Sequence, residues 1–129
     1  MGVEQYHEPP EELTQETRTI ARILTSMTEE AEAIGWYEQR LSIEQDPEAI
    51  AIMRDAIHEE YKHFSMGFEF LLRRRPEWRA IAQGIVFQDG DLVENAEAAE
   101  AGADPGEGLR DGPSHDGSLG LGSLQELGS

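Results

Sequence analysis

Two stretches of this chain each carry a glutamate inside a stripe of apolar residues, and this pattern limits the folds open to the chain. Apolar residues at alternating steps of three and four mark the inward face of an amphipathic helix. Glu30 and Glu60 lie in the middle of two such stripes: Ile23, Met27, Glu30, Ile34, Tyr37, Leu41 and Ile50, Met53, Ile57, Glu60, Phe64, Gly67, Leu71. Burying an unpaired carboxylate is costly, so we expect both glutamates to be neutralised, paired with a cation or bound to a metal.

His63 adds an imidazole beside the second glutamate, in the pattern Glu-x-x-His. On an α-helix this spacing separates the two residues by about 60° around the axis and about 4.5 Å along it, so both reach one ion. Alone, the motif is more often an exposed polar pair, but the stripe register and the matching Glu30 favour a metal site. Carboxylate-bridged di-iron and di-manganese bundles use one Glu from each of two helices and Glu-x-x-His from each of two others. The chain supplies half of that set, so Glu30, Glu60 and His63 of two copies would hold two metals.

Composition narrows the possible partners further. The formal net charge of −17 argues against nucleic acid, whose binding depends on basic residues, and favours the attraction of cations. The chain has no cysteine, so a metal must sit on Glu, Asp and His, which suits iron or manganese. No apolar run reaches 18 residues and residues 1–5 lack a signal peptide, so we expect no membrane segment and a cytoplasmic location.

The chain has room for one small all-α domain, which we place at residues 13–100. We expect two long helices, over 13–41 and 47–74, to form an antiparallel hairpin, followed by a short C-terminal helix over 77–87. Asp46 and Pro47 give a good start signal for the second long helix. A further short helix over 92–100 is a weaker prediction. Because a hairpin leaves its apolar stripe uncovered, the four-helix bundle should form only on dimerisation.

The two ends of the chain differ from this domain in composition. Residues 1–12 are polar, end in Pro9-Pro10, and are predicted to form a flexible, extended arm. Residues 101–117 are rich in glycine and are predicted to be a flexible linker. The leucines spaced among small residues in 118–125 indicate a docking peptide, although their spacing can also be incidental.

Several residues near the two glutamates have two possible roles. Tyr37, on the same stripe as Glu30, can hydrogen-bond near the metals or simply pack in the core. Glu29 and Glu32 can attract cations to the site or be ordinary solvated charges. His58 and Glu59 are rotated off the ligand face, so we expect them to be surface residues, with a ligand role as the alternative.

The motifs resemble, in type and order, those of the encapsulated ferritins. The matching segments are Glu29-Glu30-Ala31-Glu32-Ala33-Ile34-Gly35-Trp36-Tyr37, Asp46-Pro47-Glu48, Glu59-Glu60-Tyr61-Lys62-His63 and Gly117-Ser118-Leu119-Gly120-Leu121-Gly122-Ser123-Leu124. The resemblance implies a ferritin-like ferroxidase whose subunits dimerise around a di-iron centre and assemble into a ring of five dimers, a homodecamer. It implies metal ligands at Glu30, Glu60 and His63, with Tyr37 nearby and an iron-uptake site at Glu29 and Glu32.

The resemblance also implies that the peptide 118–125 docks the protein inside an encapsulin shell, a nanocompartment in the cytoplasm. The expected function is then oxidation of Fe(II) to Fe(III) with dioxygen, which feeds iron mineralisation and storage in that shell. One alternative is a non-catalytic acidic helical adaptor whose stripes are only a dimer interface. A di-iron peroxidase or a manganese catalase would use the same ligands.

Overall fold

A computed structural model describes residues 4–103, and all regular structure within that range is helical. In chain order the elements are the 3-10 helix η1 (Pro10–Glu12) and the α-helices α1 (Gln15–Ile43), α2 (Pro47–Arg74), α3 (Pro76–Gln83) and α4 (Leu92–Ala103). The predicted all-α class is therefore confirmed. The chain divides into two compact units after Leu71, the first containing α1 and most of α2 and the second containing α3 and α4. Across residues 4–103, no helix is both long enough and apolar enough to cross a membrane.

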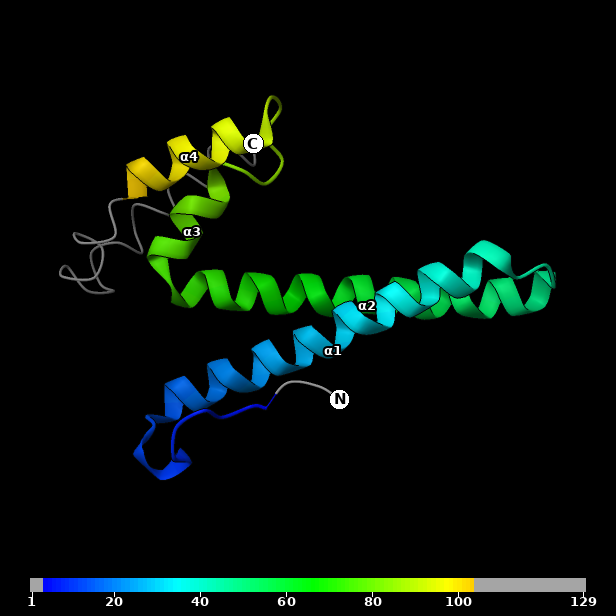
Figure 1. Ribbon diagram of the computed structural model, residues 1–129, viewed down its shortest axis with the longest axis horizontal. Coiled ribbons are helices and arrows are strands. Elements are labelled where there is room, and N and C mark those ends of the chain that lie inside the picture. The colour runs from blue at the N-terminus through cyan, green and yellow to red at the C-terminus, as the bar shows by residue number, and fades with distance from the viewer. Residues whose placement is uncertain (1–3, 104–129) are drawn as a thin grey trace. The chain divides into compact units, whose positions relative to one another are not determined.

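The first unit is the predicted antiparallel hairpin, in which α1 and α2 run side by side in opposite directions (Figure 1). Both helices begin at a capping side chain that accepts hydrogen bonds from backbone N–H groups otherwise left without partners. The Thr14 hydroxyl accepts from Thr17 N at 3.0 Å. The Asp46 carboxylate accepts from Glu48 N at 2.9 Å and from Ala49 N at 3.0 Å. The start signal at Asp46 and Pro47 is thus confirmed, and the connection between the helices is only three residues long, 44–46.

The hairpin packs through the two predicted stripes. Every stripe residue is buried or half-buried, which confirms the predicted helical register. α2 comes close to α1 at Gly67, where an added Cβ would lie 2.8 Å from Met27 Cγ. Met27, Ile57 and Leu71 are the buried hydrophobic side chains of the first unit's described part. A core this small leaves much of the apolar stripe partly open to solvent.

The segment ahead of α1 is more ordered than an extended arm. Its residues Pro10–Glu12 form η1, and Glu12 N donates to Pro9 O at 2.9 Å. The guanidinium of Arg18, in the first turns of α1, donates from Nη1 to Pro10 O at 2.7 Å. The expectation of an extended conformation is therefore wrong for residues 10–12, because the fixed φ of Pro10 suits a helical turn and Arg18 holds that turn.

The second unit pairs α3 with α4. α3 ends at Gln83, four residues before the predicted end at Phe87, and Phe87 adopts a left-handed backbone conformation with φ of 64°. The chain then bends at Gly90, whose φ of 106° favours glycine. The Asp91 carboxylate caps α4 by accepting from Glu94 N at 2.9 Å. α4 reaches Ala103 and so takes up the first three residues of the predicted linker; the rest of the linker and the peptide 118–125 lie outside the described residues.

Close approach of α3 and α4 at Gly84 gives a first prediction. A Cβ at Gly84 would lie 2.5 Å from Ala99 Cβ, and that atom is fixed to the α4 backbone, so the two helices must separate to admit it. We expect Gly84→Ala to destabilise the protein by about 1–3 kcal/mol, as overpacking does. The measurement is urea unfolding followed by circular dichroism.

The matched control is Gly102→Ala in the same unit, because a Cβ at Gly102 meets nothing within 4 Å. This change should alter the free energy of unfolding by no more than about 0.5 kcal/mol. Equal unfolding midpoints for the two variants would contradict the tight contact between α3 and α4.

Candidate metal centre

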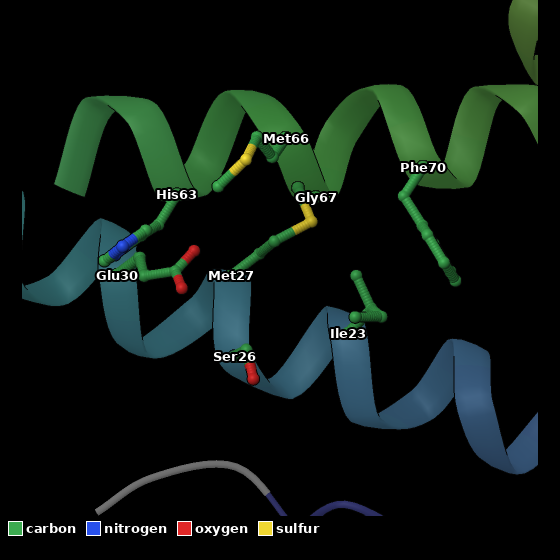
Figure 2. A pocket seen from close by; sticks show the side chains of 8 residues that line it. All are labelled: Ile23, Ser26, Met27, Glu30, His63, Met66, Gly67 and Phe70. Carbon is green, nitrogen blue, oxygen red and sulfur yellow. The ribbon is translucent and has the colours of Figure 1, made fainter. Parts of the chain in front are cut away.

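The hairpin brings three metal-binding side chains to one place. Glu30 comes from α1, while Glu60 and His63 come from consecutive turns of α2. One ligand atom from each of the three residues lies within 4.8 Å of the others. His63 Nδ1 is 3.9 Å from Glu60 Oε1. Figure 2 shows Glu30 and His63 pointing toward one another across the two helices. The three residues selected from the sequence therefore converge in space.

One carboxylate oxygen of Glu30 is shielded from solvent. Its Oε1 atom is buried and, among the described residues, has no hydrogen-bond partner. Burial raises the pKa of the Glu30 carboxyl above its ordinary value, and the nearby carboxylates of Glu60 and Glu29 raise it further, while His63 opposes the shift. Without a cation nearby, ionisation of the Glu30 carboxyl is therefore unfavourable at this site.

A groove of about 300 Å³ leads to this cluster. Most of its wall is apolar, so it offers few hydrogen bonds that would compete with a metal for the carboxylates. The site is nevertheless open on one side, because the side chains of His63 and Glu60 remain 43% and 25% exposed. The groove is lined by Ile23, Ser26, Met27, Glu30, His63, Met66, Gly67 and Phe70 (Figure 2).

The donors fit a divalent cation of intermediate hardness. Two carboxylates and one imidazole match the ligands that iron and manganese take in helical bundles. A cation here would also give the buried Glu30 oxygen the partner that the described chain does not provide. Three donors do not fill a coordination sphere, however, and they hold the metal from one side only. The cluster is therefore chemically suitable for iron, and it leaves part of the coordination sphere to further donors.

The other predicted site residues lie around this cluster rather than in it. Tyr37 is half-buried and its ring faces the Arg40 guanidinium, whose Cζ lies 5.4 Å from the ring centre. Glu29 and Glu32 are exposed, as expected for either solvated charges or a cation approach path. Glu29 is near enough to raise the pKa of Glu30, which brings its charge into the electrostatics of the site.

The environment of Glu59 is the main feature that the sequence argument missed. His58 is exposed and packs its ring 5.8 Å from that of Tyr61, as a surface residue would. Glu59 is also exposed, yet its Oε1 lies 3.8 Å from Nε2 of His63 and 3.0 Å from Nζ of Lys62. The hydrogen bond from Lys62 lowers the pKa of Glu59. The signal available in the sequence was the i,i+4 spacing of Glu59 and His63, which places such side chains next to each other on a helix.

One further contact links α1 and α2 near the site. Tyr61 donates from its hydroxyl to Glu38 Oε2 at 3.4 Å. Residue spacing within one helix does not predict this bond, because it depends on how the two helices align.

Comparison with known proteins places this arrangement in context. A model of the EncFtn-like family matches residues 5–89. An encapsulated ferritin-like protein of Rhodospirillum rubrum is 37% identical over 121 residues, which span 92% of this chain and 86% of that protein. A ferritin-like protein of Thermotoga maritima is 36% identical over 101 residues, 78% of this chain and 89% of that protein. A crystal structure of a Nitrosomonas europaea protein superposes with a TM-score of 0.66 and 32% identity, and covers 69% of this chain and 99% of that one.

The raised pKa of Glu30 gives a prediction for the metal-free protein. A carboxyl that keeps its proton more strongly in the folded state loses folding stability as pH rises from its ordinary pKa of 4.5 through the folded value. Gln cannot ionise, so Glu30→Gln should be more stable than the wild type at pH 7 in the presence of a chelator. The difference in stability between the variant and the wild type should vanish below pH 4.5, where Glu30 is protonated in both the folded and the unfolded chain. Thermal unfolding across this pH range measures it.

Adding a divalent metal should reverse the order, since the wild type gains a bound cation that Glu30→Gln cannot hold as well. If the metal-free variant were no more stable than the wild type at pH 7, the cost assigned to the Glu30 charge would be refuted.

Proposed function

Since the chain belongs to the EncFtn-like family of encapsulated ferritin-like proteins, we propose that it is a ferroxidase that oxidises Fe(II) to Fe(III) with dioxygen. Membership of the family implies an iron-related, ferritin-like function. The observation that carries the finer proposal is the convergence of Glu30, Glu60 and His63 within 4.8 Å around a buried carboxylate oxygen without a hydrogen-bond partner in the described chain. These donors suit iron, and Fe(II) is here the substrate of the reaction.

The catalytic centre proposed here is shared by two subunits. Each chain presents three donors, and the side chains of Glu60 and His63 keep exposed fractions of 25% and 43% that a second chain can cover. A second copy related by a two-fold axis would place an identical set opposite, so that six residues hold two iron ions. The same pairing would cover groove residues such as Met66, whose exposure is 57% in the single chain. Pairing of two hairpins would complete a ferritin-like four-helix bundle.

Two adjacent iron ions suit the electron balance of the reaction. Each Fe(II) gives up one electron as it becomes Fe(III), and dioxygen takes two electrons and two protons to become hydrogen peroxide, or four of each to become water. Holding two ions side by side allows the first two electrons to be delivered together. Glu30, Glu60 and His63 would bind the ions and balance their charge, and Tyr37 would act beside them.

The acidic surface supports delivery of the substrate. Glu29 and Glu32 are exposed one residue before and two residues after the half-buried Glu30, on the same helix. With a formal net charge of −17, the protein attracts Fe(II) and repels anions. We assign to Glu29 and Glu32 the role of an uptake site that passes Fe(II) toward the centre.

Anaerobic titration with Fe(II), followed by exposure to air, tests the ferroxidase proposal. Half of a two-metal site per chain should take up about one iron per chain, and the bound iron should oxidise faster than in buffer. Removing a ligand with Glu30→Ala or His63→Ala should lower the initial oxidation rate at least about tenfold. The control Glu48→Gln removes one negative charge from α2, the helix that carries His63, and should retain the wild-type rate.

Oxidation by the wild type no faster than in buffer would refute the ferroxidase assignment and favour an acidic helical adaptor. The progress of oxidation can be followed by the absorbance of Fe(III) at equal protein concentrations.

The second half of the proposal concerns where the product goes. We propose that dimers assemble into a ring of five and that the peptide 118–125, outside the described residues, docks this ring in an encapsulin shell in the cytoplasm. The name of the Rhodospirillum rubrum relative, an encapsulated ferritin-like protein, supports this assignment. An open ring has no enclosed space for a mineral, so a shell would supply the volume in which Fe(III) is stored.

Deletion of residues 118–125 separates packaging from catalysis. Co-expressed with an encapsulin shell protein, the truncated chain should no longer co-purify with intact shells. Its Fe(II) oxidation rate in free solution should match that of the full chain, because the deleted residues lie far along the chain from the helices that carry the ligands. Retention of the truncated chain in shells would contradict the docking role of the peptide.

A further inference from the structure

The two nitrogens of the His63 ring face different carboxylates. Nδ1 lies 3.9 Å from Glu60 Oε1, and Nε2 lies 3.8 Å from Glu59 Oε1. Glu59, Glu60 and His63 are all on α2, so residue spacing along one helix brings both carboxylates close to the ring. The ring is thus placed between a carboxylate that belongs to the candidate centre and one that does not.

This placement matters because the two ring nitrogens of a neutral histidine have different roles: one carries a proton and the other can bind a metal. A neutral imidazole carries one proton, and only the nitrogen without it has a lone pair for a metal. Nδ1 is the nitrogen beside Glu60, so the useful tautomer has its proton on Nε2. A histidine that ligates a metal commonly donates its other N–H to a carboxylate, which fixes both the tautomer and the ring orientation. Glu59 is in position to be that acceptor.

Lys62 holds Glu59 in this position. Its Nζ lies 3.0 Å from Glu59 Oε1, the same oxygen that approaches His63. The ammonium also offsets the charge of a carboxylate that would otherwise add to those of Glu29, Glu30 and Glu60. A movement of about 1 Å would shorten the 3.8 Å approach to an ordinary hydrogen bond, which lies near 2.9 Å. Such tightening is common when a site binds its metal or substrate.

We propose that Glu59 is a positioning residue, which accepts a hydrogen bond from Nε2–H of His63 and so presents Nδ1 to the metal beside Glu30 and Glu60. This role deepens the proposed function and rests on it, since it matters only if His63 binds a metal. Glu59 itself touches neither metal nor dioxygen. Lys62 supports it by fixing the carboxylate on the outer side of the ring.

Nitrogen NMR of the histidine rings tests the tautomer in the full-length, metal-free protein. At a pH where His63 is neutral, long-range proton–nitrogen spectra should show the wild-type ring protonated on Nε2, with the His63 signals identified by their loss in His63→Gln. In Glu59→Ala, both ring-nitrogen shifts should move toward those of a freely exchanging imidazole. A wild-type ring protonated on Nδ1, or spectra unchanged by Glu59→Ala, would overturn the proposal.

Titration with Co²⁺, followed by its visible absorption, tests the consequence for binding. Loss of the acceptor in Glu59→Ala should weaken Co²⁺ binding about 10–100-fold, the usual effect of losing such a partner. Glu59→Gln keeps an oxygen acceptor but loses the charge, so it should restore part of the affinity. Glu48→Gln, the matched loss of one charge eleven residues earlier on α2, should bind within about twofold of the wild type, since the distance along the helix is about 16 Å.

The outcomes separate this proposal from the ferroxidase assignment. Equal weakening by Glu59→Ala and Glu59→Gln would mean that Glu59 acts by its charge alone and would overturn the positioning role. Absence of Co²⁺ and Fe(II) binding to the wild type would refute the metal centre instead, while the NMR comparison would still report whether Glu59 holds the His63 ring.

Discussion

The hairpin depends on an electrostatic constraint between its two long helices. α1 and α2 bring Glu30 and Glu60 close together, and within residues 4–103 neither carboxylate has a lysine or arginine in a salt bridge with it. The basic side chain that approaches Glu60 in the described part of the chain is His63, with Nδ1 3.9 Å from Glu60 Oε1, and a histidine is charged only in part of the pH range. The chain therefore keeps a local excess of negative charge where a globular protein would normally place apolar side chains. A bound cation would resolve that conflict and would thereby couple occupancy of the site to the stability of the hairpin.

The local structure around the constraint is built to keep the two carboxylates in register. The Thr14 and Asp46 caps fix where α1 and α2 begin, and a connection of only three residues leaves the helices little freedom to slide. Close contact between Gly67 and Met27 sets the separation of the helices just beyond the site. Hydrogen bonding from Tyr61 to Glu38 joins them on the other side of the cluster. These contacts belong to the backbone and the periphery, and they leave the donor atoms free for a ligand.

Charged residues other than the three donors also affect the electrostatics of the site. Glu29 raises the pKa of Glu30, so an exposed residue contributes to the electrostatic field at a half-buried one. On α2, the ammonium of Lys62 lies against Glu59 and keeps that carboxylate on the outer side of the His63 ring. Acidic groups thus attract a cation from solvent, while the Lys62 ammonium limits their mutual repulsion. The open side of the groove is where a second copy would add its own donors and cover the remaining apolar surface.

The sequence by itself determined the helical class, the register of both stripes and the identity of the three converging donors. It could do so because these features depend on local properties. Periodicity and the cost of burying a charge apply to Glu30 and Glu60, and helix capping applies to Asp46. Only the tertiary structure decided the early end of α3 at Gln83, since the contact of Gly84 with Ala99 joins two helices that periodicity treats separately. It also decided the place of Glu59 beside His63 and the bond between Tyr61 and Glu38. Side-chain rotamers and the alignment of neighbouring helices set those contacts, and neither is encoded in the spacing of residues along one helix.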